Sequence, residues 1–330
     1  MIQFLRSKTD LKFYKGRFLT RSAFFYLHFI QPKTELKMQK MNRLEIGNLE
    51  LYPVETGRFR LDGGAMFGVV PKTLWSRMIP ADDKNRIPMA MRCMVVKSKK
   101  SDRIYLIDNG CGNKFNEKME KIYSLDYDHS NLIDSLKQLN IKPEDITDMV
   151  FTHLHFDHCG GTSDYDSDGN LIEVFPNATY HVNKRHWKTA TNPNDREKAS
   201  FFPENINPIK NSGRLNLTEN GVTFEEGFQT VIMNGHTEGQ QLPVFTSDNK
   251  TIVYAADLFP TYAHVPLPWI MGYDMKPLQT LNEKKEFLKK AVDQSWYIFM
   301  EHDAEHEIIT LKNEDGKYSM DQSMKISDIE

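Results

Sequence analysis

The chain has 330 residues, of which 39% are hydrophobic and 26% charged, the composition of a globular protein long enough for a substantial core. A net charge of −3 gives no reason to expect nucleic acid as a partner. No apolar run approaches the length of about 18 residues that a membrane helix needs. We therefore expect neither a nucleic-acid partner nor membrane association.

Residues 1–40 differ from the rest in charge. They hold nine Lys or Arg against two acidic residues, a net charge of +7 that leaves −10 for residues 41–330. The apolar stretch 23–30 follows basic residues, as in a signal peptide, but His28 interrupts it and there is no small-x-small cleavage site. We predict that residues 1–40 are a basic leader, either disordered or translated from a start assigned too early. Residues 41–330 are then expected to form a single domain.

The first elements of that domain are strands. Residues 44–51 alternate between apolar and polar around a Gly-Asn pair, which predicts a hairpin with a two-residue turn. The glycine-rich passage 62–71 follows, and its Met66 and Phe67 either line an apolar pocket or pack in the core.

A strand–helix–strand unit comes next. Residues 89–97 and 103–108 predict two strands, and the apolar spacing within 132–139 predicts one face of a helix. Residues 146–151 then predict a short buried strand.

Directly after that strand, the stretch 150–161 reads VFTHLHFDHCGG. In an extended segment His153, His155 and Asp157 project to one side, while His158 points elsewhere. This arrangement suits two metal ions, with His153 and His155 on the first and Asp157 and His158 on the second. Imidazole and carboxylate ligands favour two zinc ions, with manganese, iron or cobalt as alternatives.

The three cysteines, Cys93, Cys111 and Cys159, form no CxxC pair and are odd in number. They predict reduced thiols in a cytoplasmic protein rather than a disulfide framework. Cys159 is adjacent to the metal motif and is an alternative ligand, but the histidines and carboxylates already fill the expected positions.

Beyond the motif, residues 178–182 predict a strand and 184–191 a helix. Residues 191–212 hold three prolines and show little periodicity, which predicts a long loop that could act as a lid. Farther on, Thr280 to Glu283 predict a capping box for a helix that ends near Val292.

Three later strands each end near another metal-capable residue. Residues 230–233 precede His236, residues 251–256 precede Asp257, and residues 296–300 precede His302.

The HxHxDH pattern after a buried strand resembles the motif of the metallo-β-lactamase superfamily of dinuclear metal hydrolases, and the resemblance covers roughly residues 44–309. It implies an α+β fold of four layers, αββα, in which two mainly antiparallel sheets pack face to face with helices outside. It also implies that Asp108, in an Asp-x-Gly turn, orients the motif loop.

The same resemblance completes the ligand set. His236 lies in a passage similar to the superfamily's Gly-His-Thr-x-Gly motif and should be the third imidazole of the first metal. Asp257 should bridge both ions, and His302 should complete the second. His306 is the alternative to His302, but it lies beyond the strand end.

Two cations that share a bridging water lower its pKa from ~15.7 toward ~7, which gives a metal-bridging hydroxide that can attack a carbonyl or phosphoryl centre. Asp157 is expected to assist the proton transfer. The chain resembles the N-acyl-homoserine lactonase and methyl parathion hydrolase branch, which implies a lactonase for N-acyl-homoserine or related lactones and, by analogy, a homodimer. A phosphotriesterase or aryl-ester hydrolase is the alternative. A non-hydrolytic metal or redox sensor is more remote, because such proteins usually carry Glu where His155 stands.

Apolar residues near the motif are expected to form the substrate pocket, namely Met66, Phe67, Trp269 and Met271. Many lactonases place a tyrosine three residues after the bridging aspartate, where this chain has Pro260. Tyr262 or His264 would then support the leaving alkoxide in its place.

Overall fold

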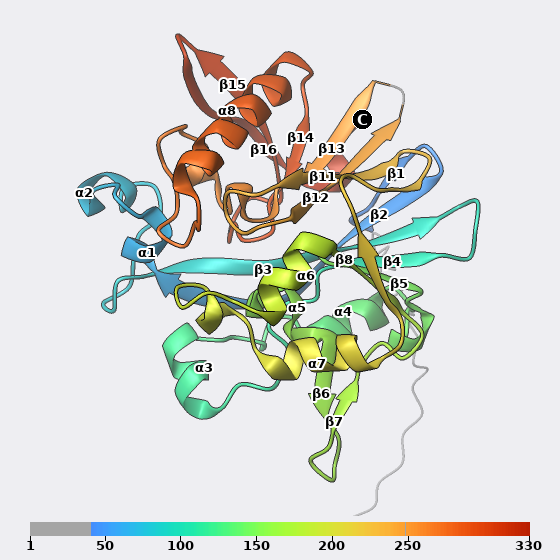
Figure 1. Cartoon of the computed structure of the whole chain (residues 1–330). Helices are drawn as coiled ribbons and strands as arrows, with labels where there is room; N and C mark the ends of the chain where they lie inside the picture. Colours follow the sequence, from blue (N-terminus) through green and yellow to red (C-terminus); the bar gives the residue numbers. More distant parts are fainter. Residues whose placement is uncertain (1–40, 248) are drawn as a thin grey trace, which may run out of the picture. The chain divides into compact units, whose positions relative to one another are not determined.

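The computed structural model describes residues 41–247 and 249–330, which are built around two seven-stranded sheets (Figure 1). In spatial order the first sheet contains β1 (Leu44–Ile46), β2 (Leu49–Asp62), β3 (Arg86–Ser98), β4 (Ile104–Ile107), β5 (Asp148–Val150), β8 (Thr179–Asn183) and β9 (Leu215–Thr218). The second contains β10 (Thr223–Glu225), β11 (Phe228–Met233), β12 (Gln240–Ser247), β13 (Lys250–Tyr254), β14 (Tyr297–Phe299), β15 (Ile308–Glu314) and β16 (Lys317–Met324). Strands β6 (Ser163–Tyr165) and β7 (Leu171–Glu173) pair separately. The predicted basic leader, residues 1–40, lies outside the described residues.

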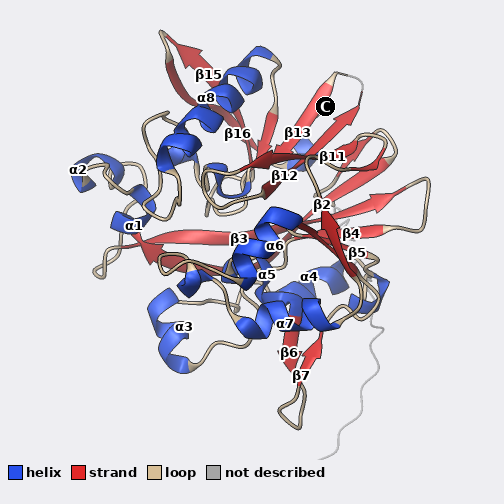
Figure 2. Ribbon diagram, viewed as in Figure 1, coloured by secondary structure: helices blue, strands red, loops and turns tan. Residues whose placement is uncertain are grey.

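The α-helices connect these strands (Figure 2). They are α1 (Gly63–Phe67), α2 (Lys72–Trp75), α3 (Glu117–Tyr123), α4 (Leu132–Gln138), α5 (Phe156–Cys159), α6 (Lys184–Thr191), α7 (Pro203–Asn211) and α8 (Pro277–Asp293). The predicted hairpin at residues 44–51, the helix within 132–139 and the helix at 184–191 are confirmed.

Strand β3 explains why the elements stack in four layers. Successive residues of a strand point to opposite faces of the sheet. Met94 and Val96 belong to the core between the two sheets, while Cys93 and Val95 belong to the core beneath α4, α6 and α7. On the other side α8 packs against the second sheet, where it contacts β15. The predicted αββα arrangement is therefore confirmed.

The first sheet is mixed. The pairings β1–β2, β2–β3 and β3–β4 are antiparallel, whereas β4–β5, β5–β8 and β8–β9 are parallel. A parallel neighbour must be reached by a crossover, and the three crossovers carry α3 with α4, α5 with β6 and β7, and α6 with α7. The second sheet is antiparallel except for β13–β14.

Two local predictions were wrong. The expected long loop at 191–212 contains α7, which begins with Pro203 in its first turn and buries Ile206 and Ile209. Its internal Pro208 hides the helical pattern in the sequence. Helix α8 begins at Pro277, so Thr280 is buried inside the helix and does not cap it.

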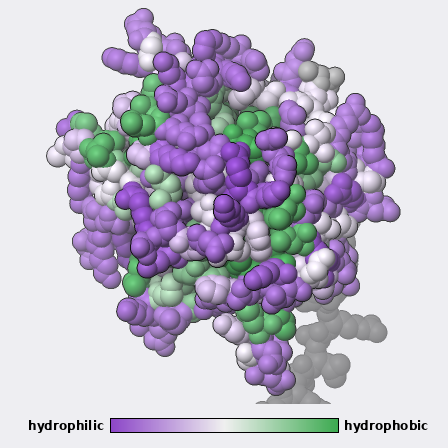
Figure 3. Space-filling view, in the orientation of Figure 1, coloured by the Kyte–Doolittle hydropathy of each residue, from purple (hydrophilic) through white to green (hydrophobic). Residues whose placement is uncertain are grey.

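The surface is mixed. The face in Figure 3 is largely hydrophilic, with hydrophobic residues in separate groups. Across residues 41–247 and 249–330, the structure has no helix of the length and apolar character needed to cross a membrane.

Candidate metal centre

The turn after β4, which contains Asp108, holds the loop after β5 that carries the HxHxDH motif. Asp108 accepts hydrogen bonds from the Thr152 amide at 2.8 Å and from the Thr152 hydroxyl at 2.6 Å. Beyond the motif, Gly160 touches the next turn so closely that an added Cβ would lie 2.0 Å from the Cys111 carbonyl oxygen. The backbone on both sides of the motif is therefore locked into the core.

Within this loop and three strand ends, seven buried side chains converge. We call them the metal floor: His153, His155, Asp157, His158, His236, Asp257 and His302. The first group joins His153, His155 and His236 with Asp257. His236 Nε2 lies 3.2 Å from His155 Nδ1 and 3.2 Å from Asp257 Oδ2. His153 Nε2 lies 3.8 Å from the same carboxylate oxygen.

The second group joins Asp157, His158 and His302. His302 Nε2 lies 3.0 Å from His158 Nε2 and 3.8 Å from Asp157 Oδ2. It also lies 3.2 Å from Asp257 Oδ1. The Asp257 carboxylate therefore lies between the two groups, with Oδ2 near His153 and His236 and Oδ1 near His302.

The floor has the chemistry of a cation site. His153 Nε2 and Asp257 Oδ1 are buried and have no hydrogen-bond partner among the described residues, although buried polar atoms are rarely left unpaired. Burial and the neighbouring imidazoles hold the pKa of His153 well below its usual range, so its ring is neutral and can offer a lone pair. Two groups of imidazoles and carboxylates that share one aspartate fit two divalent ions.

Each imidazole is oriented by a partner on its other nitrogen. His158 Nδ1 donates to Asp108 at 3.0 Å, and His153 Nδ1 donates to the Thr152 hydroxyl at 3.0 Å. Burial, followed by the charge of Glu301, raises the pKa of Asp108 to about 7. The sequence-based role of Asp108 as the support of the motif loop agrees with these contacts.

Other orienting residues escaped the sequence analysis. His236 Nδ1 donates to Asp274 at 2.9 Å, and His302 Nδ1 donates to the Ala90 carbonyl at 2.9 Å. His155 Nε2 donates to Glu197 at 3.2 Å. These partners lie far from the ligands along the chain, so no local motif reveals them.

Glu197 is held tightly in this role. It is 4% exposed and also accepts a hydrogen bond from the Thr237 hydroxyl. Burial opposes its ionisation, but the hydrogen bonds from His155 and Thr237 prevail and lower its pKa to about 2. Nearby, His186 is fully buried and accepts a hydrogen bond from the Leu154 amide at 2.7 Å. Neither residue belongs to a local sequence motif that would predict its place beside the floor.

His306 and Cys159, the two alternative ligands, have partners outside the metal floor. His306 Nδ1 contacts the Ser323 hydroxyl at 2.8 Å, and Cys159 Sγ donates to the Leu154 carbonyl at 3.3 Å. Neither residue belongs to the two groups of the floor.

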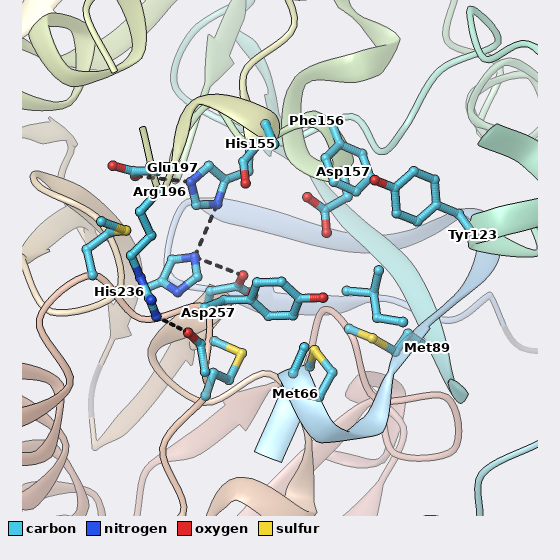
Figure 4. A pocket seen from close by; sticks show the side chains of 18 residues that line it. Met66, Met89, Tyr123, His155, Phe156, Asp157, Arg196, Glu197, His236 and Asp257 are labelled. Carbon is cyan, nitrogen blue, oxygen red and sulfur yellow. Dashed lines mark hydrogen bonds and ion pairs between the residues drawn. The ribbon is translucent and has the colours of Figure 1, made fainter. Parts of the chain in front are cut away.

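A cavity of about 360 Å³ opens above the floor (Figure 4). Its lining includes four residues of the metal floor, His155, Asp157, His236 and Asp257. We call the remaining lining residues the cavity wall: Leu61, Ala65, Met66, Met89, Tyr123, Phe156, Arg196, Glu197, Ala199, Ser200, Met271, Gly272, Tyr273 and Met275. Met66 and Met271 thus lie where the sequence predicts them.

Phe67 and Trp269 do not line this cavity. Phe67 is fully buried behind it, stacked between Trp75 and His264 at ring-centroid distances of 5.0 and 4.3 Å. Trp269 meets Phe67 edge to face at 5.8 Å. Their place is therefore the core that supports the wall, which corrects the expectation that they contact substrate.

Tyr262 and His264 are also directed away from the cavity. The Tyr262 hydroxyl donates to the Met78 carbonyl at 2.7 Å. His264 Nε2 donates to the Met66 carbonyl at 2.9 Å, and burial lowers the pKa of this ring to about 3. Neither side chain can reach a leaving group from these positions, which corrects both catalytic expectations.

The cavity wall instead contains two other phenols, Tyr123 and Tyr273. Burial raises the pKa of Tyr273 to about 12, with smaller effects from Tyr123, Asp62 and Asp157. The hydroxyl is therefore protonated at neutral pH and can donate a hydrogen bond.

The chain was compared with known proteins. Residues 92–302 match the sequence profile of the metallo-beta-lactamase superfamily. An N-acyl homoserine lactonase of Bacillus thuringiensis is 24% identical over 184 residues, which span 54% of this chain and 65% of that protein, just under two thirds of its length. A probable metal-dependent hydrolase from Staphylococcus aureus has a crystal structure that matches with a TM-score of 0.77 at 29% identity, over 86% of this chain and 98% of that one. The dizinc quorum-quenching lactonase AidC matches with a TM-score of 0.69 at 22% identity, over 86% and 97% of the two chains.

Proposed function

Because the chain belongs to the metallo-β-lactamase superfamily, we propose that it is a dinuclear-metal hydrolase that opens lactones, with N-acyl-homoserine and related lactones as the first class to test. The observation that carries this proposal is Asp257, which turns one buried carboxylate oxygen toward each group of imidazoles. The lactonases among the compared proteins support the choice of substrate class.

In this proposal His153, His155 and His236 hold one divalent ion, and Asp257 is shared. Asp157, His158 and His302 complete the site of the second ion. Such ions, when bound, lower the pKa of a water molecule toward neutrality and polarise the carbonyl oxygen of a substrate. The chain itself supplies the fixed orientation of these ligands, since each imidazole is held by a second hydrogen bond.

The remaining steps fall to residues around the cavity. Asp157 lines it and is 7% exposed, and in Figure 4 its carboxylate points into the open space, so it accepts the proton released in the attack. Tyr123 and Tyr273 take the role predicted for Tyr262 or His264, donating a hydrogen bond to the leaving oxygen. The methionines and Phe156 of the wall exclude water and contact the acyl chain.

A phosphotriesterase or aryl-ester hydrolase is the second candidate. The observation that favours it is Pro260, which stands where many lactonases have a tyrosine. An aryl leaving group needs less support than an alkoxide, because its oxygen leaves as a weaker base. The same ligands and the same cavity would serve this reaction.

One experiment separates these functions. Proton release is followed on protein loaded with Zn²⁺ or Co²⁺, with hexanoyl-homoserine lactone and an aryl phosphotriester as substrates, and with chelator-treated protein as the control. We expect saturable lactone opening and weak phosphotriesterase activity. The reverse order would favour the second candidate, and metal binding without turnover of either substrate would favour a non-hydrolytic sensor.

A further inference from the structure

Arg196 is the one cationic side chain among the residues that line the cavity. It comes from the segment between α6 and α7 and extends along one side of the opening in Figure 4. Its neighbour Glu197 is buried, and its carboxylate accepts hydrogen bonds from His155 and Thr237. Arg196 itself is exposed at the edge of the cavity, and Glu197 does not pair with it.

Three arginines of the described residues form no ion pair, namely Arg60, Arg77 and Arg196, and of these only Arg196 lines the cavity. No carboxylate within residues 41–247 and 249–330 lies within ion-pair distance of its guanidinium, and the hydrogen bond found for it runs from Nη2 to the Gly272 carbonyl. Seven other arginines do pair with an acid: Arg43, Arg58, Arg86, Arg92, Arg103, Arg185 and Arg214.

The hydrogen bond to Gly272 links the exposed guanidinium to the segment that carries Met271 and Tyr273. The Gly272 amide donates to the Ala65 carbonyl at 2.8 Å, so this part of the wall is tied to α1. At Gly68, directly after α1, an added Cβ would lie 2.7 Å from the Ile270 carbonyl oxygen, which shows how closely the two segments pack. A guanidinium held at one nitrogen keeps its other donors available in a fixed plane, and this geometry matches a carboxylate.

We propose that Arg196 is an anion-binding subsite, and that the substrate is an ester or lactone with a carboxylate remote from the bond that is hydrolysed. This inference rests on the proposed hydrolase function and narrows its substrate class. The cavity that holds Arg196 and part of the floor is also lined by apolar residues, among them Met271 and Met275, which fit an aliphatic segment joining the two polar ends.

Two esters of equal chain length test the proposal on the Zn²⁺-loaded full chain. One is 4-nitrophenyl hexanoate, and the other is mono-4-nitrophenyl adipate, which adds a terminal carboxylate. We expect the wild type to prefer the adipate ester by about 10-fold or more in kcat/KM, mainly through a lower KM, since a charge-assisted pair has this strength. Arg196→Met should bring the ratio to about one, and Arg196→Lys should restore part of it.

Arg77→Met is the matched control, because Arg77 is exposed, lies outside the cavity lining and has no ion pair among the described residues. This control should keep the wild-type ratio. A wild type without preference for the adipate ester, or a preference that survives in Arg196→Met, would overturn the proposal.

If neither ester is hydrolysed, the lactone assay still decides the proposed function, and the subsite is judged by binding alone. Calorimetry on the same protein would then compare adipate with hexanoate. Tighter binding of adipate that is lost in Arg196→Met would uphold the anion subsite, and equal binding would refute it.

Discussion

The metal floor and the cavity wall are built on different principles, although they enclose the same space. Every floor residue is at most 8% exposed, and each imidazole has a second hydrogen bond that fixes its ring. The wall is assembled from six separate parts of the chain, and it includes Tyr273, which is 40% exposed. If the proposed function holds, the chemistry depends on residues fixed in the core, whereas the exposed part of the wall, such as Arg196 and Tyr273, can change without disturbing them.

The largest effect is expected from Asp257→Asn, which removes the shared charge of the floor. An amide can donate but cannot bridge two cations as a carboxylate does, so both ions should bind more weakly and kcat/KM should fall by about 10³-fold or more. Bound zinc is measured after dialysis. Asp293→Asn on α8 is the control, because that exposed carboxylate pairs with Lys289. Retention of two tightly bound ions in Asp257→Asn would contradict the bridging role.

A smaller effect is expected from Asp274→Asn, which acts on the support of one ligand. His236 would lose a charged acceptor at 2.9 Å, and the affinity of the first ion should fall by about 10- to 100-fold. The second ion has no contact with Asp274 and should keep its affinity. Competition with a chelator measures both constants. Equal weakening of both ions would show that the two groups of the floor are not separable.

The buried side chain of Lys284 should make the stability of the protein depend on pH. It is fully buried in α8 and donates to the Pro266 and Trp269 carbonyls at 2.9 Å. Burial lowers its pKa to about 7, whereas the unfolded chain has the ordinary value of about 10.4. Between these values the unfolded state binds more protons, so stability should rise with pH by up to about 1.4 kcal/mol per unit.

Lys284→Met should remove this rise, since the side chain no longer titrates. Urea unfolding of both proteins between pH 7 and pH 9 provides the measurement. Parallel pH profiles for the wild type and the variant would show that Lys284 is charged in the folded state.

The smallest effect is expected behind the wall, at Tyr262. Its hydroxyl is directed at Met78, so Tyr262→Phe should keep kcat/KM within about twofold and cost about 1 kcal/mol of stability for one lost hydrogen bond. Tyr273→Phe, which acts inside the cavity, should lower kcat/KM more. A tenfold lower kcat/KM in Tyr262→Phe, with its metal content unchanged, would show that Tyr262 takes part in the reaction.

The metal floor could be predicted because its signals are local. Four of the floor residues lie within six residues of one motif, and the other three follow strands. The residues that orient these histidines could not be predicted, because they lie far away along the chain. Asp274 is 38 residues from His236, and Glu197 is 42 residues from His155. The fold brings these pairs together through long-range packing that one sequence does not encode locally.

The residues that line the cavity wall could be predicted only in part. Met66 and Phe67 are neighbours in the sequence, and both were expected to face substrate. The short helix α1 turns them about 100° apart, so Met66 lines the cavity and Phe67 enters the core. Composition alone identifies the apolar character of this passage but not the side of the helix on which each residue lies.

The most direct test of the two-ion floor is a titration of the wild-type chain with Co²⁺, followed by the visible absorption of the bound ion. We predict that the absorption rises until two equivalents per chain are bound and that Zn²⁺ then displaces both. An end point at one equivalent or less, in protein whose circular dichroism shows it to be folded, would contradict a dinuclear floor.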